Sequence, residues 1–252
     1  MPIGMPKIPF LIDEDEDEDE DAKERNATWV DLYNVLYRTR SIFLGDAIHL
    51  EIANHIAGLM IFLTIQDATQ NIYLFINSPG GLAVAGLLIF DTMQYVKPPV
   101  YTLGLGVLAS MASFLLVGGE MSKRIMGPNS RVMLHQPESD YNGKDQMEEV
   151  FLDIEEIEDI REMVIKAYLE RTRLTREVLN DQLERNYFMP ATEAKYYGIV
   201  DEIGVKNLLG RLLDESASQD NSLDPDAPDE GASQDNSLDP DAPDETRPPK
   251  LR

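Results

Sequence analysis

The chain has 252 residues, a formal net charge of −24 at pH 7, no cysteine, and three histidines at His49, His55 and His135. The lack of cysteine excludes disulfides and thiolate metal sites, and three scattered histidines do not predict a metal centre. No basic cluster could neutralise phosphates, and no uncharged apolar stretch reaches about 18 residues, which argues against nucleic-acid binding and a membrane span.

The negative charge is concentrated in two segments. Residues 13–21 read DEDEDEDED, and residues 214–252 hold 12 acidic and three basic residues and carry a tandem 15-residue repeat. Such segments cannot bury enough apolar surface to offset their chain entropy. We therefore expect a flexible N-terminal segment with the acidic tract over 1–28, one globular domain over 29–213, and a disordered acidic tail over 214–252.

Within the central segment, apolar periodicity predicts strands that alternate with helices, beginning near Trp29. The first predicted elements are a helix over 50–65, a buried strand over 73–76 with a turn over 77–81, a helix over 82–96, a strand over 98–106, a helix over 110–119, and two short strands within 124–137. Alternation of this kind is typical of an α/β fold with a parallel sheet.

The second half of the domain is predicted to be mainly helical. Apolar residues at steps of three or one mark one face of a long helix over 147–168, whose other face is rich in Glu and Asp. A shorter helix is expected over 175–185. Thr192 is expected to cap one or two helical turns that end at Gly198, and a strand is expected over 199–203.

Ser110 is notable because it lies in an otherwise apolar run, GLGVLASMASFLLVGG, where a strand is expected to give way to a helix. A serine in such a run is more often a core residue whose hydroxyl bonds a nearby carbonyl, so a nucleophile needs a base and an oxyanion hole elsewhere. His135, at the end of an expected strand, is the one histidine outside the N-terminal third. The paired glycines of NSPGG let backbone amides approach a ligand closely.

Five blocks of the sequence, in this order, resemble the proteolytic subunits of the Clp protease family, which are self-compartmentalising serine peptidases. The blocks are YLFINSPGG, IFDTMQYVKPPV, LASMASFLLVGG, SRVMLHQP and ATEAKYYGIVDEI. The opening MPIGMPKIPF is similar to the plastid-encoded members, and the resemblance covers roughly 29–205 and the first ten residues. It implies an α/β fold of the Clp protease and crotonase type, a spiral of ββα units with a long protruding helix.

The resemblance also implies roles for particular residues. Ser110 takes the place of the nucleophile, His135 that of the general base, and the backbone amides of Gly81 and Met111 those of the oxyanion hole. In the family the acid of the triad is the aspartate of an ERD sequence, whereas the matching LERNYFMPATEA puts Asn186 at that position. A neutral amide can hold the histidine tautomer only if its carbonyl faces the ring, and it stabilises the imidazolium weakly.

By position in the chain, Asp181 and Asp201 are the other candidates for the group that orients the histidine. Asp181 lies five residues before Asn186, which on a helix turns its side chain about 140° away. We expect a serine endopeptidase whose activity is weakened at Asn186. The alternative is a catalytically impaired structural subunit with the same fold. A distant alternative is a dinucleotide-binding protein, because GLGVLA from Gly104 matches a loose fingerprint, G-x-G-x-x-A.

The resemblance implies partners as well. Subunits of this kind form heptameric rings that stack into a tetradecamer, and a ring-shaped Clp-family ATPase delivers unfolded polypeptides to them. ATP would then be bound by that partner, so we expect no cofactor on this chain. The N-terminus shows neither a signal-peptide nor a transit-peptide pattern, so we expect the protein to act where it is made. The similarity of MPIGMPKIPF to plastid-encoded members implies that this is the chloroplast stroma.

Overall fold

The computed structural model describes residues 6–10, 28–138 and 147–204. The chain divides into two units, Met1–Gly204 and Val205–Arg252. The second unit lies outside the described residues, and so does the acidic tract at 13–21. The predictions of a disordered tail and a solvated acidic tract therefore stay predictions.

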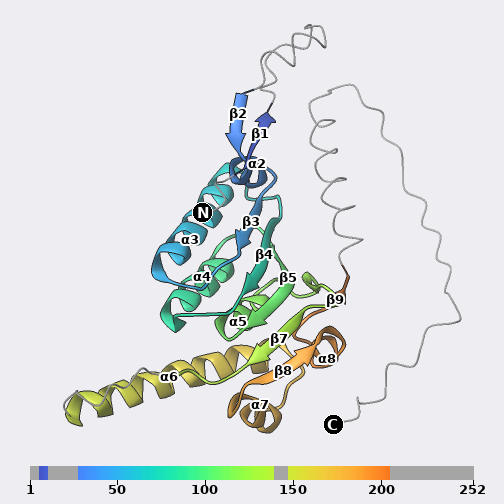
Figure 1. The fold of residues 1–252 in the computed structure, drawn as a ribbon. Coiled ribbons are helices and arrows are strands. Elements are labelled where there is room, and N and C mark those ends of the chain that lie inside the picture. Colours follow the sequence, from blue (N-terminus) through green and yellow to red (C-terminus); the bar gives the residue numbers. More distant parts are fainter. Residues whose placement is uncertain (1–5, 11–27, 139–146, 205–252) are drawn as a thin grey trace, which may run out of the picture. The chain divides into compact units, whose positions relative to one another are not determined.

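The described residues form strands and helices in alternation along the chain (Figure 1). The elements are β1 (Lys7–Phe10), β2 (Thr28–Asp31), α2 (Leu32–Arg38), β3 (Ser41–Leu44), α3 (Leu50–Gln66), β4 (Ile72–Ser78), α4 (Ala83–Tyr95), β5 (Val100–Ala109), α5 (Met111–Val117), β6 (Arg124–Met126), β7 (Arg131–Leu134), α6 (Met147–Arg171), α7 (Arg176–Leu183), β8 (Tyr187–Pro190), α8 (Ala191–Tyr196) and β9 (Glu202–Ile203).

Within the described residues the main sheet has seven strands, with β3, β4, β5, β6 and β9 paired in that order and all parallel. A helix follows each of β3, β4 and β5, and such crossovers are what parallel neighbours require. The strands β7 and β8 complete the sheet, with β7 parallel to β5 and β8 antiparallel to β7. The expected α/β fold with a parallel sheet and a long helix is confirmed.

The two short strands predicted within 124–137 are present, but they do not pair with each other. Both run parallel to β5, with β6 beside Thr102–Gly104 and β7 beside Val107–Ala109. The turn between them is held to β5, since the amide of Gly127 donates to the carbonyl of Gly104 at 2.9 Å. As a result β5 runs longer than the predicted 98–106, and its last residue carries the chain directly to Ser110.

The core lies between the sheet and its helices. Most side chains of the strands β3, β4 and β5 are buried, and so are those on the inner faces of the helices that follow them. Among these are Ile42, Leu74, Ile76, Met60, Ile89 and Leu115. Figure 1 shows α3 and α4 on one side of the sheet and α6 extending away from the other elements. The part of the chain that the structure describes contains no helix long and apolar enough to cross a membrane.

Some predicted boundaries are wrong for local reasons. The cap of α8 is Pro190, not Thr192, because β8, which was not predicted, runs directly into that helix. The end at Gly198 is confirmed, with φ +74. The last strand is shorter than 199–203, because the amide of Ile199 still donates to the carbonyl of Ala194 at 2.8 Å. Regular structure also begins before Trp29, since β1 pairs with β2.

Candidate active site

Ser110 occupies a strained turn between β5 and α5. Its backbone has φ 54° and ψ −125°, a conformation that costs a residue with a side chain about 1–3 kcal/mol. The turn is fixed from both sides. The Ser110 amide donates to the carbonyl of Met133 at 2.9 Å, and its own carbonyl accepts from the Ser113 hydroxyl at 2.6 Å. A sharp strand-to-helix turn of this kind exposes a hydroxyl at the end of the sheet.

A buried tyrosine is connected to this turn through hydrogen bonds. The Tyr168 hydroxyl of α6 lies 2.9 Å from the Ser113 hydroxyl. Burial raises the pKa of the Tyr168 phenol, against the opposing hydrogen bond with Ser113, so the phenol stays protonated and can donate. With Tyr168 donating to Ser113, and Ser113 donating to the carbonyl of Ser110, the long helix is linked to the strained residue. Nothing in the sequence pointed to this link beyond the helical periodicity that buries Tyr168.

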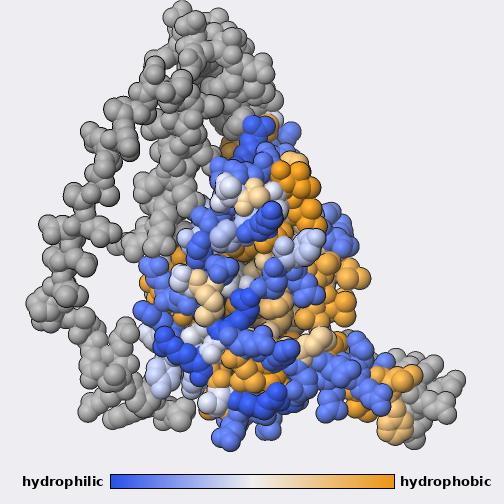
Figure 2. All heavy atoms as spheres, turned by 180° about the vertical axis from the view of Figure 1, so that it is seen from behind, coloured by the Kyte–Doolittle hydropathy of each residue, from blue (hydrophilic) through white to orange (hydrophobic). Residues whose placement is uncertain are grey.

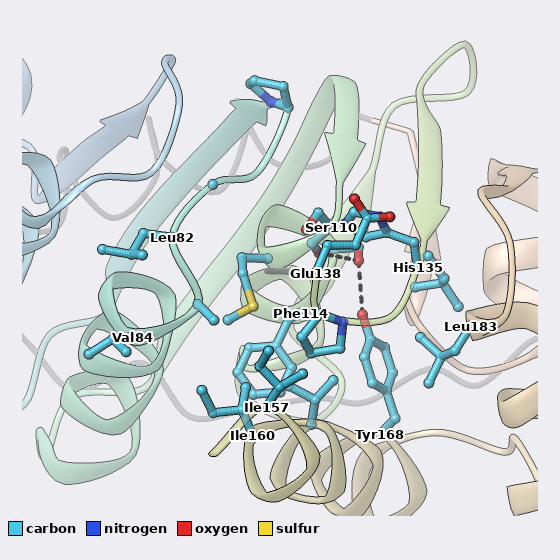
Figure 3. A pocket seen from close by; sticks show the side chains of 18 residues that line it. Leu82, Val84, Ser110, Phe114, His135, Glu138, Ile157, Ile160, Tyr168 and Leu183 are labelled. Atoms are coloured by element: carbon cyan, nitrogen blue, oxygen red, sulfur yellow. Dashed lines mark hydrogen bonds and ion pairs between the residues drawn. The ribbon is translucent and has the colours of Figure 1, made fainter. Parts of the chain in front are cut away.

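Ser110 and His135 meet although they are 25 residues apart in the chain. The distance from Ser110 Oγ to His135 Nε2 is 2.7 Å, a hydrogen bond that the sequence analysis anticipated (Figure 3). Parallel pairing of β5 with β7, in the register Ala109 with Met133, explains the meeting, because the carboxyl ends of parallel neighbours lie at the same edge of a sheet. A hydroxyl in this position can transfer its proton to the imidazole.

The glycine pair after β4 lies against Ser110. A Cβ on Gly80, where φ is +92°, would come within 2.6 Å of both the Ala109 carbonyl oxygen and the Ser110 Cβ. A Cβ on Gly81 would come within 2.2 Å of the Ile48 carbonyl oxygen, which accepts from the amide of Leu82. Both positions therefore require glycine.

The two amides assigned to an oxyanion hole border the same pocket as Ser110. Gly81 and Met111 both line that pocket, and neither amide donates a hydrogen bond to any of the residues in the described ranges. Met111 is the first residue of α5, where the amide has no partner within the helix. Two free amides beside a nucleophile could donate hydrogen bonds to the negatively charged oxygen of a tetrahedral intermediate.

The pocket has a volume of about 620 Å³ and is mostly apolar. Figure 3 shows Ser110, His135 and Glu138 on one side of it, with Ile157 and Ile160 of α6 facing them across the hollow. The other large side chains lining it that carry no oxygen or nitrogen are Leu82, Val84, Met111, Phe114, Leu134, Val164 and Leu183. The nucleophile candidate therefore opens into a space that suits an apolar side chain.

The three candidates for the orienting group lie in different surroundings. Asn186 directly precedes β8, whose last registered pair with β7 is Tyr187 with Leu134, the residue before His135. It is exposed, and the structure shows no hydrogen bond from it to His135. Asp181 is exposed on α7. Asp201 accepts two hydrogen bonds, of 2.9 and 2.7 Å, from the guanidinium of Arg124, so it is the half-buried partner of a buried guanidinium in an ion pair.

A residue that the sequence analysis missed lies beside the histidine. Glu138 Oε1 is 3.6 Å from His135 Nδ1, on the side of the ring opposite the contact with Ser110. The signal was available in the sequence as HQPE, in which a carboxylate follows the histidine by three residues. It was missed because residues after a strand have no fixed periodicity, so spacing alone does not say where the side chain lies.

The structure gives no support to a dinucleotide site. The run GLGVLA lies inside β5, where the fingerprint requires a loop that opens a helix. Among the residues with described positions, no group of three or more His, Asp or Glu side chains is placed to hold a metal ion.

A strained serine at the end of a parallel strand, bonded to a histidine beside an apolar pocket, is the arrangement found in serine hydrolases. Residues 23–207 match the family model described as Clp protease. The chain is 84% identical, over the full length of both chains, to an ATP-dependent Clp protease proteolytic subunit of Oenothera elata subsp. hookeri. It is 51% identical to the subunit of that name from Sorghum bicolor over 81% of this chain and 90% of that one.

The chain belongs to the Clp protease family. The resemblance drawn from the five sequence blocks is thereby confirmed. Membership of this family implies serine peptidase activity.

Proposed function

We propose that this chain is a serine endopeptidase subunit of an ATP-dependent Clp-type barrel, which hydrolyses unfolded polypeptides. The observation that carries the proposal is the 2.7 Å contact between Ser110 Oγ and His135 Nε2, on a strained turn at the edge of an apolar pocket. The family match over residues 23–207 supports the same assignment.

In the proposed reaction Ser110 is the nucleophile and His135 the general base. As Oγ attacks the carbonyl carbon of a peptide bond, its proton moves to His135 Nε2, and the oxygen of the tetrahedral intermediate lies near the amides of Gly81 and Met111. His135 then returns the proton to the leaving amine. A water molecule that gives its proton to His135 then hydrolyses the acyl-enzyme. These steps need no metal or cofactor on this chain.

The pocket supports a preference in the peptide. Leu82, Val84 and Leu183 line it together with Ile157 and Ile160, and buried apolar area stabilises a bound apolar side chain by about 25 cal/mol per Å². We infer that the residue beside the bond to be cleaved is preferably large and apolar. A fluorogenic peptide with leucine or methionine at this position is therefore the appropriate substrate for assays.

Exposed apolar side chains support assembly into rings. Phe62 and Ile65 of α3 are 58% and 79% exposed, and Figure 2 shows hydrophobic residues gathered along that edge of the molecule. Phe151 and Leu152 of α6 are also more than half exposed. Apolar surface of this extent is typical of subunit interfaces. Heptameric rings stacked into a tetradecamer would cover the exposed apolar side chains of both α3 and α6.

The proposal includes a partner and a location. The relatives from Oenothera and Sorghum are named ATP-dependent, which supports a ring-shaped Clp-family ATPase that binds ATP and delivers substrate. Both relatives are from plants, and the opening MPIGMPKIPF is similar to plastid-encoded members, which supports a location in the chloroplast stroma.

A second candidate is a catalytically impaired structural subunit of the same ring. The observation that favours it is Asn186, which is neutral, exposed, and without a hydrogen bond to His135 in the structure. In a serine protease of the trypsin type, the change from Asp to Asn in the triad lowers kcat about 10⁴-fold, because the histidine is then held in the wrong tautomer.

Covalent labelling separates the two candidates. A fluorophosphonate probe should label Ser110 in the assembled protein, with the labelled peptide identified by mass spectrometry. Ser110→Ala should abolish labelling and peptide hydrolysis, whereas Ser122→Gly, which removes an exposed hydroxyl at φ +70°, should change neither. An assembled protein that takes up no probe at Ser110 would establish the structural role instead.

A further inference from the structure

We propose that Glu138 supplies the carboxylate that orients His135 and stabilises its imidazolium, in a chain whose triad acid position holds Asn186. Glu138 is then a positioning residue, since it acts through the histidine and does not touch the reacting atoms. The inference rests on the proposed function, in which His135 is the general base.

The two nitrogens of the His135 imidazole face different groups. His135 Nε2 is engaged by the Ser110 hydroxyl at 2.7 Å, which leaves Nδ1 as the nitrogen that an orienting group must hold. Glu138 Oε1 lies 3.6 Å from that Nδ1. The ring is thus flanked by a hydroxyl on one nitrogen and a carboxylate on the other, the order in which a catalytic triad is arranged (Figure 3).

No other described carboxylate is close enough to orient His135. Within the described ranges, Glu138 is the one carboxylate with an oxygen within 4.0 Å of His135. Asp201 is bound to Arg124, and Asp181 forms no ion pair with the histidine. Asn186 carries no charge, is exposed, and makes no hydrogen bond with His135.

The backbone holds Glu138 near the ring. The amide of Gln136, directly after the histidine, donates to the carbonyl of Leu183 at 2.9 Å, which ties this segment to the end of α7. Pro137 then restricts φ to about −65°. Glu138 is therefore two residues from an anchored position, and both it and His135 line the pocket.

The present separation of 3.6 Å between Glu138 Oε1 and His135 Nδ1 is longer than a hydrogen bond. The Glu138 side chain is 75% exposed and that of His135 is 22% exposed, so the pair contributes little to the stability of the free protein. A peptide in the pocket would displace water from the same residues, and catalytic hydrogen bonds commonly shorten when substrate binds. The contact is expected to matter for the rate more than for folding.

The proposed step is balanced with respect to protons. The Ser110 proton moves to Nε2 as the Oγ–C bond forms, and the proton on Nδ1 stays on the ring, where the Nδ1–H group points at the Glu138 carboxylate as a hydrogen-bond donor. Glu138 remains ionised throughout, and no additional reactant is required. Removing its charge should therefore slow formation of the imidazolium without changing how the peptide binds.

The test uses the full-length assembled protein and a fluorogenic peptide with leucine at the cleaved position. Glu138→Gln should lower kcat about tenfold and leave KM nearly unchanged, less than the loss at a buried triad acid because Glu138 is exposed. Glu138→Asp should retain more activity than Glu138→Gln, because it keeps the charge. Glu184→Gln, which neutralises an exposed glutamate at the end of α7, is the matched control and should leave kcat unchanged.

A second background separates an orienting role from a structural one. Asn186→Asp puts a carboxylate at the position where the family resemblance implies the triad acid, so adding Glu138→Gln in that background should lower kcat by less than about twofold. An equal loss in both backgrounds, or no loss in either, would overturn the proposal. The rate of fluorophosphonate labelling at Ser110 should fall in parallel with kcat. If instead the hydrolysis survives Ser110→Ala, the proposed function itself fails. Activity that depends on Ser110 but not on Glu138 would refute only the role of Glu138.

Discussion

The ion pair between Arg124 and Asp201 should hold the end of the sheet together, and removing it should destabilise the fold without touching the chemistry. Arg124 is 1% exposed, and its guanidinium donates to both carboxylate oxygens of Asp201 at 2.9 and 2.7 Å. It also donates to the carbonyl of Arg171 at 2.7 Å. The pair thus joins β6 to the residue before β9 and to the end of α6.

Asp201→Asn leaves the buried guanidinium without its anion. Breaking a buried pair by removing one partner costs about 3–5 kcal/mol, because the remaining charge is left uncompensated. At about 2–4 °C per kcal/mol for a domain of this size, the thermal midpoint should fall by roughly 6–20 °C. Asp181→Asn removes a charge from an exposed position on α7 and should change the midpoint by about 1–2 °C at most.

The pH dependence follows from the state of the carboxyl. Burial raises the pKa of Asp201, but the hydrogen bonds and charge of Arg124 outweigh it and hold that pKa below its usual range. A lowered pKa contributes stability that is present above the unfolded value, about 3.9, and is lost as pH falls through the folded value. The difference in free energy of unfolding between wild-type and Asp201→Asn protein should therefore be constant at neutral pH. It should become smaller only below about pH 4.

Differential scanning fluorimetry at fixed protein concentration, together with peptide hydrolysis well below the midpoint, tests this reasoning. The expected variant unfolds early but hydrolyses peptide at the wild-type rate while folded. A variant that keeps the wild-type midpoint and loses hydrolysis would show that Asp201 acts as the acid of the triad.

Three further predictions concern the site and the assembly. Asn186→Asp should increase short-peptide hydrolysis, because it restores a carboxylate at the position that the family resemblance assigns to the triad acid; an unchanged initial rate would count against the assignment of this position. Gly80→Ala should reduce labelling of Ser110 about 100-fold, since its Cβ would displace the nucleophile, whereas Gly45→Ala, with no atom within 4 Å of the added Cβ, should label normally. Sedimentation at micromolar concentration should show rings. Ile65→Glu should weaken these rings, whereas Gln66→Glu, which adds a charge at the next residue of α3, should not. A wild-type protein that stays monomeric, alone and with companion Clp subunits, would contradict the assembly.

Local pattern was sufficient for most of the elements. The helices at 50–66 and 147–171 and the strand at 72–78 could be predicted, because a face buried against the core imposes a period that the residues show directly. The short β8 was missed, since its four residues have no period of their own and form a strand only by pairing with β7. The pairing of β6 and β7 with β5 was likewise invisible in the sequence.

The sequence by itself determined the kinds of group available to the site: one serine at a strand end, one histidine outside the N-terminal third, and an amide where the family has an acid. Only the tertiary structure decided which of them meet. The parallel register of β5 and β7 brings Ser110 to His135. The ion pair with Arg124 engages Asp201 away from the histidine, and the segment after β7 puts Glu138 beside Nδ1 of His135. The physical reason is that a catalytic contact joins side chains distant in the chain, and its distance depends on strand register and backbone turns that no local periodicity encodes.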